Sequence, residues 1–154
     1  MKHPKRIGYL ALLIAGVPWA GPVLADGDRY TATDPTWKAE CGSCHVAYPP
    51  ALLPAASWRA VMAGLDKHFG TDASLDPATH ARITTFLERN AGRERGAPAK
   101  PPLRVTETRW FVHKHDEVPG AVWKSVKVKS PSNCAACHTG AERGDFDEDN
   151  LRIP

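Results

Sequence analysis

The sequence predicts a mainly α-helical protein of two small domains, the second with little regular secondary structure. Three observations lead to this fold class. Aspartate–proline and serine–proline pairs, which are typical of helix starts, precede several segments. No segment before residue 100 alternates apolar and polar residues over the length of a strand. The short pattern Cys-x-x-Cys-His occurs once on each side of a segment rich in Gly, Pro and charge.

The first 25 residues have the layout of a secretory signal peptide. Three basic residues precede an uncharged, largely apolar run at 7–17, and small residues suitable for cleavage end at Ala25. The run is shorter than the roughly 20 residues of a membrane-spanning helix, although an uncleaved anchor stays an alternative. We therefore expect export to the periplasm and a mature chain that begins at Asp26.

The mature chain has no net charge. The leader holds three of the 20 Lys and Arg residues and none of the 17 Asp and Glu residues, so 17 of each sign follow it. Such a balance gives no reason to expect nucleic acid as a partner. The length allows one domain or two small ones.

Three helices are expected in the N-terminal domain. Asp34-Pro35 predicts the N-cap and first residue of a short helix that presents Cys41, Cys44 and His45. The proline-rich segment 48–54 cannot continue it and is expected to form a stiff loop over the first site.

The other two helices follow from apolar spacing. Ser57 is the predicted N-cap of one that runs to Gly70, and Asp76-Pro77 begins another that ends at Ala91-Gly92. The apolar residues at helical spacing in these two segments are Trp58, Met62, Leu65, Phe69, Ile83, Phe86 and Leu87.

Residues 91–102 have the composition of a linker or long surface loop. We accordingly expect domains at 26–97 and 98–154. The segment 103–129 has no clean period and predicts short irregular structure, whereas Ser130-Pro131 repeats the helix-start signal before the second pattern.

The two patterns are Cys41-Gly42-Ser43-Cys44-His45 and Cys134-Ala135-Ala136-Cys137-His138, and they contain all four cysteines. Cys-x-x-Cys-His is the attachment pattern of c-type haem. Two thiols at this spacing can add to the two vinyl groups of one porphyrin, and the next imidazole can then bind the iron. The sequence therefore predicts two covalently bound haems c.

Other functions of paired cysteines explain fewer features of the two patterns than haem attachment does. A four-thiolate zinc site or two structural disulfides would leave the histidine after each pair without a role. A thioredoxin-like redox pair would require a βαβ pattern, and none surrounds either pair.

Beyond these patterns, the chain resembles the dihaem cytochrome c family of small exported bacterial proteins. The similar stretches span essentially the whole mature chain; they are residues 41–50 (CGSCHVAYPP), 53–54 (LP), 57–58 (SW), 68–70 (HFG), 108–110 (TRW), 115–118 (HDEV) and 133–146 (NCAACHTGAERGDF). The resemblance implies an N-terminal domain like a small cytochrome c, and a C-terminal domain that wraps its haem with little regular structure. It also implies bis-histidine irons and electron exchange with a membrane cytochrome b and a small oxygen-binding monohaem cytochrome.

Besides the proximal His45 and His138, the mature chain offers four histidines for two distal positions. For the first haem we predict His68, which follows the apolar face of its helix where the chain can turn inward. His80 and Met62 stay alternatives, although a methionine within an apolar stripe is more typical of packing.

For the second haem the choice lies between His113 and His115. Two residues apart, they cannot bind the same side of one iron. The resemblance favours His115, with His113 at the surface, and it leaves open that a histidine of one domain serves the other haem.

Two strong axial ligands on each iron leave no position for a substrate. We therefore expect a monomeric electron carrier that is not an enzyme and takes no small-molecule substrate. The alternative is a haem enzyme or gas-binding protein with one five-coordinate iron. The segment 100–129 is rich in Lys and Arg and the tail 142–149 in Asp and Glu, an asymmetry suited to steering a redox partner.

Overall fold

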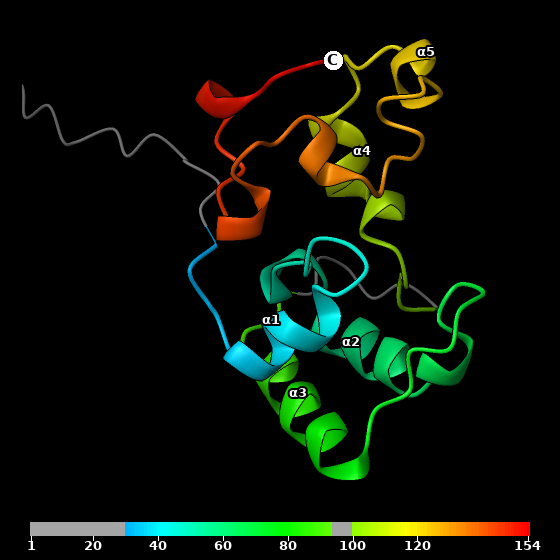
Figure 1. Ribbon diagram of the computed structural model, residues 1–154, viewed down its shortest axis with the longest axis vertical. Coiled ribbons are helices and arrows are strands. Elements are labelled where there is room, and N and C mark those ends of the chain that lie inside the picture. Colours follow the sequence, from blue (N-terminus) through cyan, green and yellow to red (C-terminus); the bar gives the residue numbers. More distant parts are fainter. Residues whose placement is uncertain (1–29, 94–99) are drawn as a thin grey trace, which may run out of the picture.

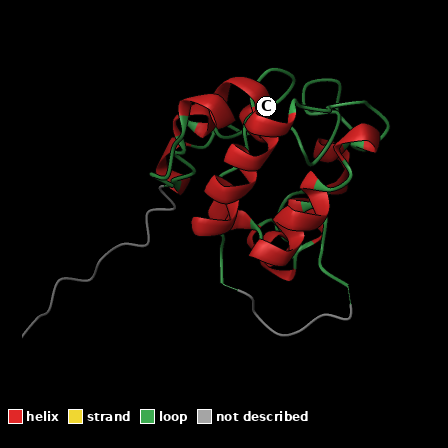
Figure 2. Cartoon of the chain, turned by 90° about the horizontal axis from the view of Figure 1, so that it is seen from below, coloured by secondary structure: helices red, strands yellow, loops and turns green. Residues whose placement is uncertain are grey.

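The computed structural model describes residues 30–93 and 100–154, which form helices joined by loops (Figures 1 and 2). Isolated bridges are the only β pairing among these residues. The mainly α prediction is confirmed. The predicted leader and residues 94–99 of the predicted linker lie outside the described residues. In the part that is described, no helix is long and apolar enough to cross a membrane.

Three α-helices of the N-terminal half pack together: α1 (Pro35–Cys41), α2 (Ala55–Met62) and α3 (Pro77–Arg89). The predicted aspartate–proline starts of α1 and α3 are confirmed. Asp34 accepts hydrogen bonds from the backbone N–H groups of Thr36 and Trp37 at 2.9 and 3.0 Å. Asp76 does the same at the start of α3. Both caps satisfy donors that have no partner inside the helix.

The prediction for α2 is wrong at both ends. The carbonyl of Pro54 accepts from the N–H groups of Ser57 and Trp58, so the helix starts before Ser57, which is fully buried inside it. The helix stops at Met62, and a 3-10 turn, η2 (Leu65–Lys67), replaces the predicted last turns. The apolar residues keep their helical spacing beyond Met62, so this spacing alone predicts a helix that is too long.

The C-terminal half has little regular structure, as predicted. It contains η3 (Val105–Glu107), α4 (Arg109–Lys114), α5 (Gly120–Trp123), η4 (Cys134–Ala136), η5 (Ala141–Arg143) and η6 (Glu148–Asn150). Ser130-Pro131 does not start an α-helix, which corrects the prediction. The Ser130 hydroxyl accepts from the N–H of Ser132 at 3.1 Å and closes a local turn instead.

One apolar cluster reaches into both halves. Its buried members are Trp37, Leu53, Trp58, Met62, Ile83, Leu87, Val105 and Phe111. Two hydrogen bonds also connect the halves. The hydroxyl of Tyr48 donates to the carbonyl of Ser132 at 2.7 Å, and the N–H of Tyr30 donates to the carbonyl of Gly144 at 2.8 Å. In Figure 1 the helices α1–α3 occupy one end of the molecule and α4 and α5 the other.

Candidate haem-binding sites

The first Cys-x-x-Cys-His pattern straddles the end of α1. Cys41 is the last helical residue, and the N–H of Gly42 donates to the carbonyl of Lys38 at 3.1 Å. A side chain at Gly42 would collide with that carbonyl, which explains the glycine. Cys44 and His45 follow in a turn, so the helix presents only the first of the three residues that were predicted to lie on it.

The structure brings the imidazole rings of His45 and His68 close together. Their ring centroids are 6.3 Å apart and their planes differ by 21°. The Nδ1 of His45 donates to the carbonyl of Val46 at 2.8 Å, because a carbonyl can only accept. This fixes the proton on Nδ1 and leaves the lone pair of Nε2 available for a metal.

A tight turn holds His68. The residues after it, Phe69 and Gly70, have φ values of 50° and 101°, and the N–H of Thr71 donates to the His68 carbonyl at 3.0 Å. The Phe69 ring meets the His68 ring edge-on at 4.8 Å, and the Arg104 guanidinium lies 3.9 Å above Phe69. Burial, followed by the charges of His45 and Arg104, lowers the pKa of His68. The imidazole is thereby kept in the neutral form that binds metals.

The other two candidates for the first site have different surroundings. The Nε2 of His80 lies 3.1 Å from the carbonyl of Met62, in hydrogen-bonding contact between α3 and α2. Met62 is itself 4% exposed and belongs to the apolar cluster.

The second site pairs His115 with His138. Their ring centroids are 6.1 Å apart and their planes differ by 70°. The Nδ1 of His115 donates to the carbonyl of Phe111 at 2.9 Å, and the Phe111 ring stacks on that imidazole at 4.0 Å. His113 points elsewhere: its side chain is 85% exposed and lies 3.5 Å from Asp116.

No disulfide joins any two of the four cysteines, contrary to the two-disulfide alternative. Burial raises the pKa of Cys41 and of Cys134 to about 11. Among residues 30–93 and 100–154, no three His, Cys, Asp or Glu side chains come together as direct ligands of one metal ion, so the two pairs do not form the four-thiolate zinc site.

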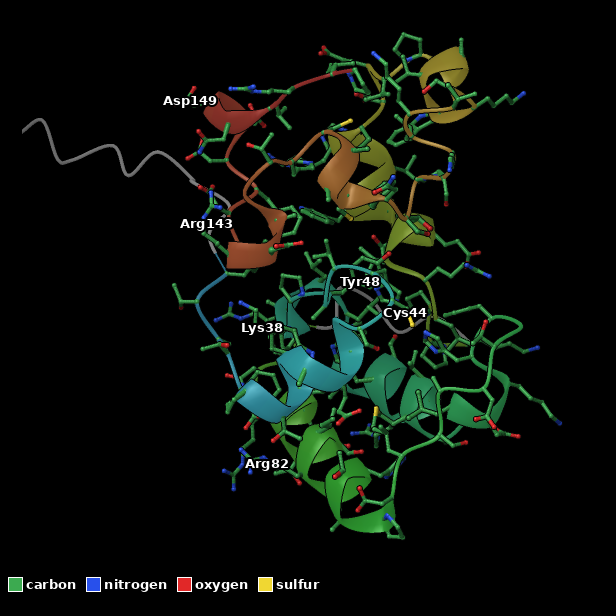
Figure 3. All side chains as sticks on the ribbon, viewed as in Figure 1. Lys38, Cys44, Tyr48, Arg82, Arg143 and Asp149 are labelled. Atoms are coloured by element: carbon green, nitrogen blue, oxygen red, sulfur yellow. The ribbon has the colours of Figure 1, made fainter. Side chains whose placement is uncertain are left out.

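A cavity of about 1270 Å³ lies between the two halves. The first pattern contributes Cys44 and His45 to its wall, and the second contributes Cys134. Figure 3 shows Tyr48 at the junction of the two halves. The Tyr48 ring stacks on His45 at 4.9 Å, while its hydroxyl binds Ser132, two residues before Cys134.

The aromatic partners of the imidazoles were not predicted as site residues. Tyr48 was assigned to the proline-rich loop and to the first stretch of the resemblance, Phe111 to an apolar cluster, and Phe146 to the C-terminal stretch of the resemblance. Phe146 lies 5.1 Å from His138. Helical spacing offers a signal for Phe111, which precedes His115 by four residues, whereas nothing in the spacing points to Phe146.

Both pairs of histidines fit a haem iron. A metal–imidazole bond is about 2 Å long, so the ring centroids of two imidazoles on opposite sides of one metal lie about 6 Å apart. Each pair has this separation and includes the histidine of one Cys-x-x-Cys-His pattern.

Comparison with known proteins agrees with this chemistry. The family model for dihaem cytochrome c matches residues 37–146. No curated protein sequence matches the chain. A diheme cytochrome c structure from Rhodobacter sphaeroides is 50% identical, covers 76% of this chain and 99% of its own, and superposes with a TM-score of 0.69.

Two further solved structures are similar. One is described as DHC purified from Rhodobacter sphaeroides; it is 54% identical over 74% of this chain and 97% of its own, with a TM-score of 0.66. The other is a diheme cytochrome type c from Shewanella baltica, 47% identical over 78% of this chain and 92% of its own, with a TM-score of 0.70. The chain therefore belongs to the dihaem cytochrome c family, whose two covalently attached haems c it carries.

Proposed function

We propose that this protein is a periplasmic electron carrier in which two histidines hold each haem iron. The proposed ligands are His45 with His68 and His138 with His115. The thioether bonds are assigned to the two cysteine pairs Cys41/Cys44 and Cys134/Cys137. The family supports electron transfer in general terms, and the ligand set is the finer statement made here.

The spacing of the imidazoles carries this proposal. Two independent pairs have centroid separations of 6.3 and 6.1 Å, the distance that one shared metal requires. In His45 and His115 the Nδ1 atom is already engaged by a backbone carbonyl, which favours coordination through Nε2. The contact of His80 with the Met62 carbonyl argues against His80 as a ligand.

Bis-histidine coordination fits a carrier better than an enzyme. With both axial positions occupied, neither iron has a position for a substrate or a gas, so the polypeptide serves to tune the potential and to orient the haems. Replacing the Met/His pair of many cytochromes c by His/His lowers the reduction potential. We therefore propose that both haems work at potentials below those of Met-ligated relatives.

Three further parts of the proposal concern organisation and partners. The halves are two domains, 26–97 and 98–154. The chain acts as a monomer after removal of its leader. A membrane cytochrome b and a small oxygen-binding monohaem cytochrome exchange electrons with it.

The ligand set is tested by spectroscopy of single variants. The wild-type ferric protein is expected to show two low-spin haems by EPR, and the reduced protein should not bind carbon monoxide. His68→Ala and His115→Ala should each convert one haem to a high-spin, carbon monoxide-binding form. His80→Ala and His113→Ala are the matched controls and should leave both haems low-spin.

Carbon monoxide binding by the wild-type protein would contradict the proposal and would favour an enzyme or gas-binding protein with one open iron. A high-spin signal in His80→Ala, together with an unchanged spectrum in His68→Ala, would reverse the distal assignment at the first site.

A further inference from the structure

Three exposed lysines and one exposed valine follow one another closely in the segment between α5 and η4. This group, here called the lysine patch, comprises Lys124, Val126, Lys127 and Lys129. All four side chains are exposed, and Val126 is 84% exposed, more than any other large apolar side chain of the described residues. Exposed apolar and charged side chains occur together in small transient docking surfaces.

The charges of the lysine patch are not neutralised within the described part of the chain. Neighbouring cations have acidic partners: Lys114 lies 3.5 Å from Glu148, and Arg104 lies 3.6 Å from Glu107. No ion pair joins Lys124, Lys127 or Lys129 to a described residue. Glu148 of the acidic tail thus pairs with Lys114 of α4, and the described residues place no ion-pair partner on the three patch lysines.

Backbone hydrogen bonds fix the patch in place. The carbonyl of Ser125 accepts from the N–H groups of Val128 and Lys129 at 3.2 and 2.8 Å. Val128 is fully buried, and its carbonyl accepts from the side-chain amide of Asn133 at 3.1 Å. Because Asn133 directly precedes Cys134, the patch is anchored to the second haem-attachment pattern.

Trp123 connects the patch to the second site. This half-buried residue directly precedes Lys124, and its ring lies 5.9 Å from that of His115 and 6.3 Å from that of Phe111. A protein bound over the patch would therefore be one aromatic side chain away from a proposed ligand of the C-terminal haem.

We propose that the lysine patch binds an acidic one-electron carrier protein that exchanges electrons with the C-terminal haem. The inference rests on the proposed function and adds the chemistry and the place of the partner. Complementary charge raises the association rate, and the exposed Val126 supplies an apolar contact beside it. One electron leaves the donor protein and one is gained by the ferric iron, or the reverse, and no covalent bond forms or breaks.

Binding is measured first without relying on electron transfer. An acidic flavodoxin, reduced to its hydroquinone, is added to the ¹⁵N-labelled ferrous cytochrome, and amide chemical shifts are followed by NMR. The expected shift changes cluster at residues 122–129 and vanish at high ionic strength. Shift changes centred on α1–α3 instead would overturn the proposal.

The rate of reduction of the ferric protein by the same flavodoxin gives the second readout. We expect the second-order rate constant to fall about tenfold or more between low and high salt. Replacing Lys124, Lys127 and Lys129 together by Gln should lower the low-salt rate about as much. Val126→Asp should lower the rate as well, because it adds to the patch a negative charge that repels an acidic partner.

The matched control removes the same number of positive charges from the N-terminal half of the chain. Lys67, Arg89 and Arg93 are exposed, and α3 lies far from α5 (Figure 1). Their joint replacement by Gln should change the rate less than twofold if the effect is local. An equal loss in patch and control variants, or a rate independent of salt, would overturn the proposal.

Two further measurements separate the remaining outcomes. Reduction of both low-spin haems by dithionite in every variant shows that the carrier function holds, so that a failure of the flavodoxin results concerns the patch alone. Sedimentation with phosphatidylglycerol vesicles tests a lipid surface as the occupant. Binding to those vesicles that is lost in the triple Lys→Gln variant would overturn the assignment to a protein partner.

Discussion

At the scale of single residues, the proposed ligands differ from the other histidines in their hydrogen bonds. His45 and His115 donate from Nδ1 to backbone carbonyls, whereas His80 uses Nε2 on the Met62 carbonyl. The sequence predicts His45 and His138 as the proximal ligands from their place after each cysteine pair. It left His80 open because the contact between α3 and α2 joins residues whose proximity no local pattern encodes.

The burial of Ser57 lowers the free energy of unfolding. It is fully buried, and its hydroxyl has no hydrogen-bond partner among the described residues. A buried hydroxyl without a partner costs about 1–3 kcal/mol. Ser57→Ala is therefore expected to raise the free energy of unfolding by about 1 kcal/mol in urea denaturation. A clear fall in stability would show that the hydroxyl has a partner in solution.

Tyr48 gives a pH prediction. Burial is the main reason that its pKa rises to about 12 from the ordinary value of 10.0. The fold favours the neutral phenol, so its contribution to stability is complete below pH 10 and is lost as the pH rises through about 12. Ultraviolet difference titration of the haem-loaded protein should show one late-ionising tyrosine. This phase should be absent in Tyr48→Phe; its persistence there would contradict the assignment.

At the scale of elements, helix starts with an aspartate–proline pair were predictable and helix ends were less so. The Asp34 and Asp76 caps depend only on neighbouring residues, so the sequence alone predicts them. The early end of α2 could not be predicted, because the apolar residues keep their helical spacing past Met62. The absence of a helix after Ser130 could not be predicted either, because Pro131 is equally suited to a turn. In the second site, the haem pattern is carried by a 3-10 turn rather than an α-helix.

The α1 cap gives a prediction at this scale. Asp34 caps α1 and also accepts from Arg82 of α3 at 2.9 Å; Figure 3 labels Arg82 on the outer side of α3. The Arg82 hydrogen bond, followed by that of the Trp37 N–H, lowers the Asp34 pKa below 3.8. A lowered pKa stabilises the fold above pH 3.8 and ceases to do so as the pH falls through the folded value.

Asp34→Asn keeps a capping oxygen but removes the charge that Arg82 binds. The variant should melt below the wild type at pH 6 by circular dichroism, and the difference should shrink as the pH drops below 3.8. Arg82→Gln should reproduce this pattern. A gap between the melting temperatures that stays constant down to pH 2 would show that the ion pair is not its cause.

At the scale of the whole molecule, the fold class was predictable from the two Cys-x-x-Cys-His patterns and from the linker at residues 91–102 that separates them. The contacts that join the two halves could not be predicted. The apolar cluster, the Tyr48–Ser132 hydrogen bond and the shared cavity all depend on contacts between residues far apart in the chain. The spacing of apolar residues along the sequence carries no information about such contacts.

The apolar core of the C-terminal half is small, which leads to a prediction about the haem. Its buried apolar residues are Val105, Phe111, Val128 and Ala141. Chains with so little apolar burial usually need a bound group for stability. Replacing Cys134 and Cys137 by Ser should therefore leave amides of 105–128 exchanging with deuterium at near-unprotected rates, while α1–α3 stay protected. Equal protection in both halves would contradict this dependence.

The Tyr30–Gly144 hydrogen bond has a consequence for folding kinetics. It joins the start of the described chain to a residue near its end, so it closes a very long loop and is expected to form after the transition state. Gly144 has a φ of 72°, and a side chain there would collide with the Tyr30 carbonyl. In stopped-flow measurements, Gly144→Ala should accelerate unfolding several-fold and leave the refolding rate unchanged. This contact would then determine how long the native protein lasts rather than how quickly it forms.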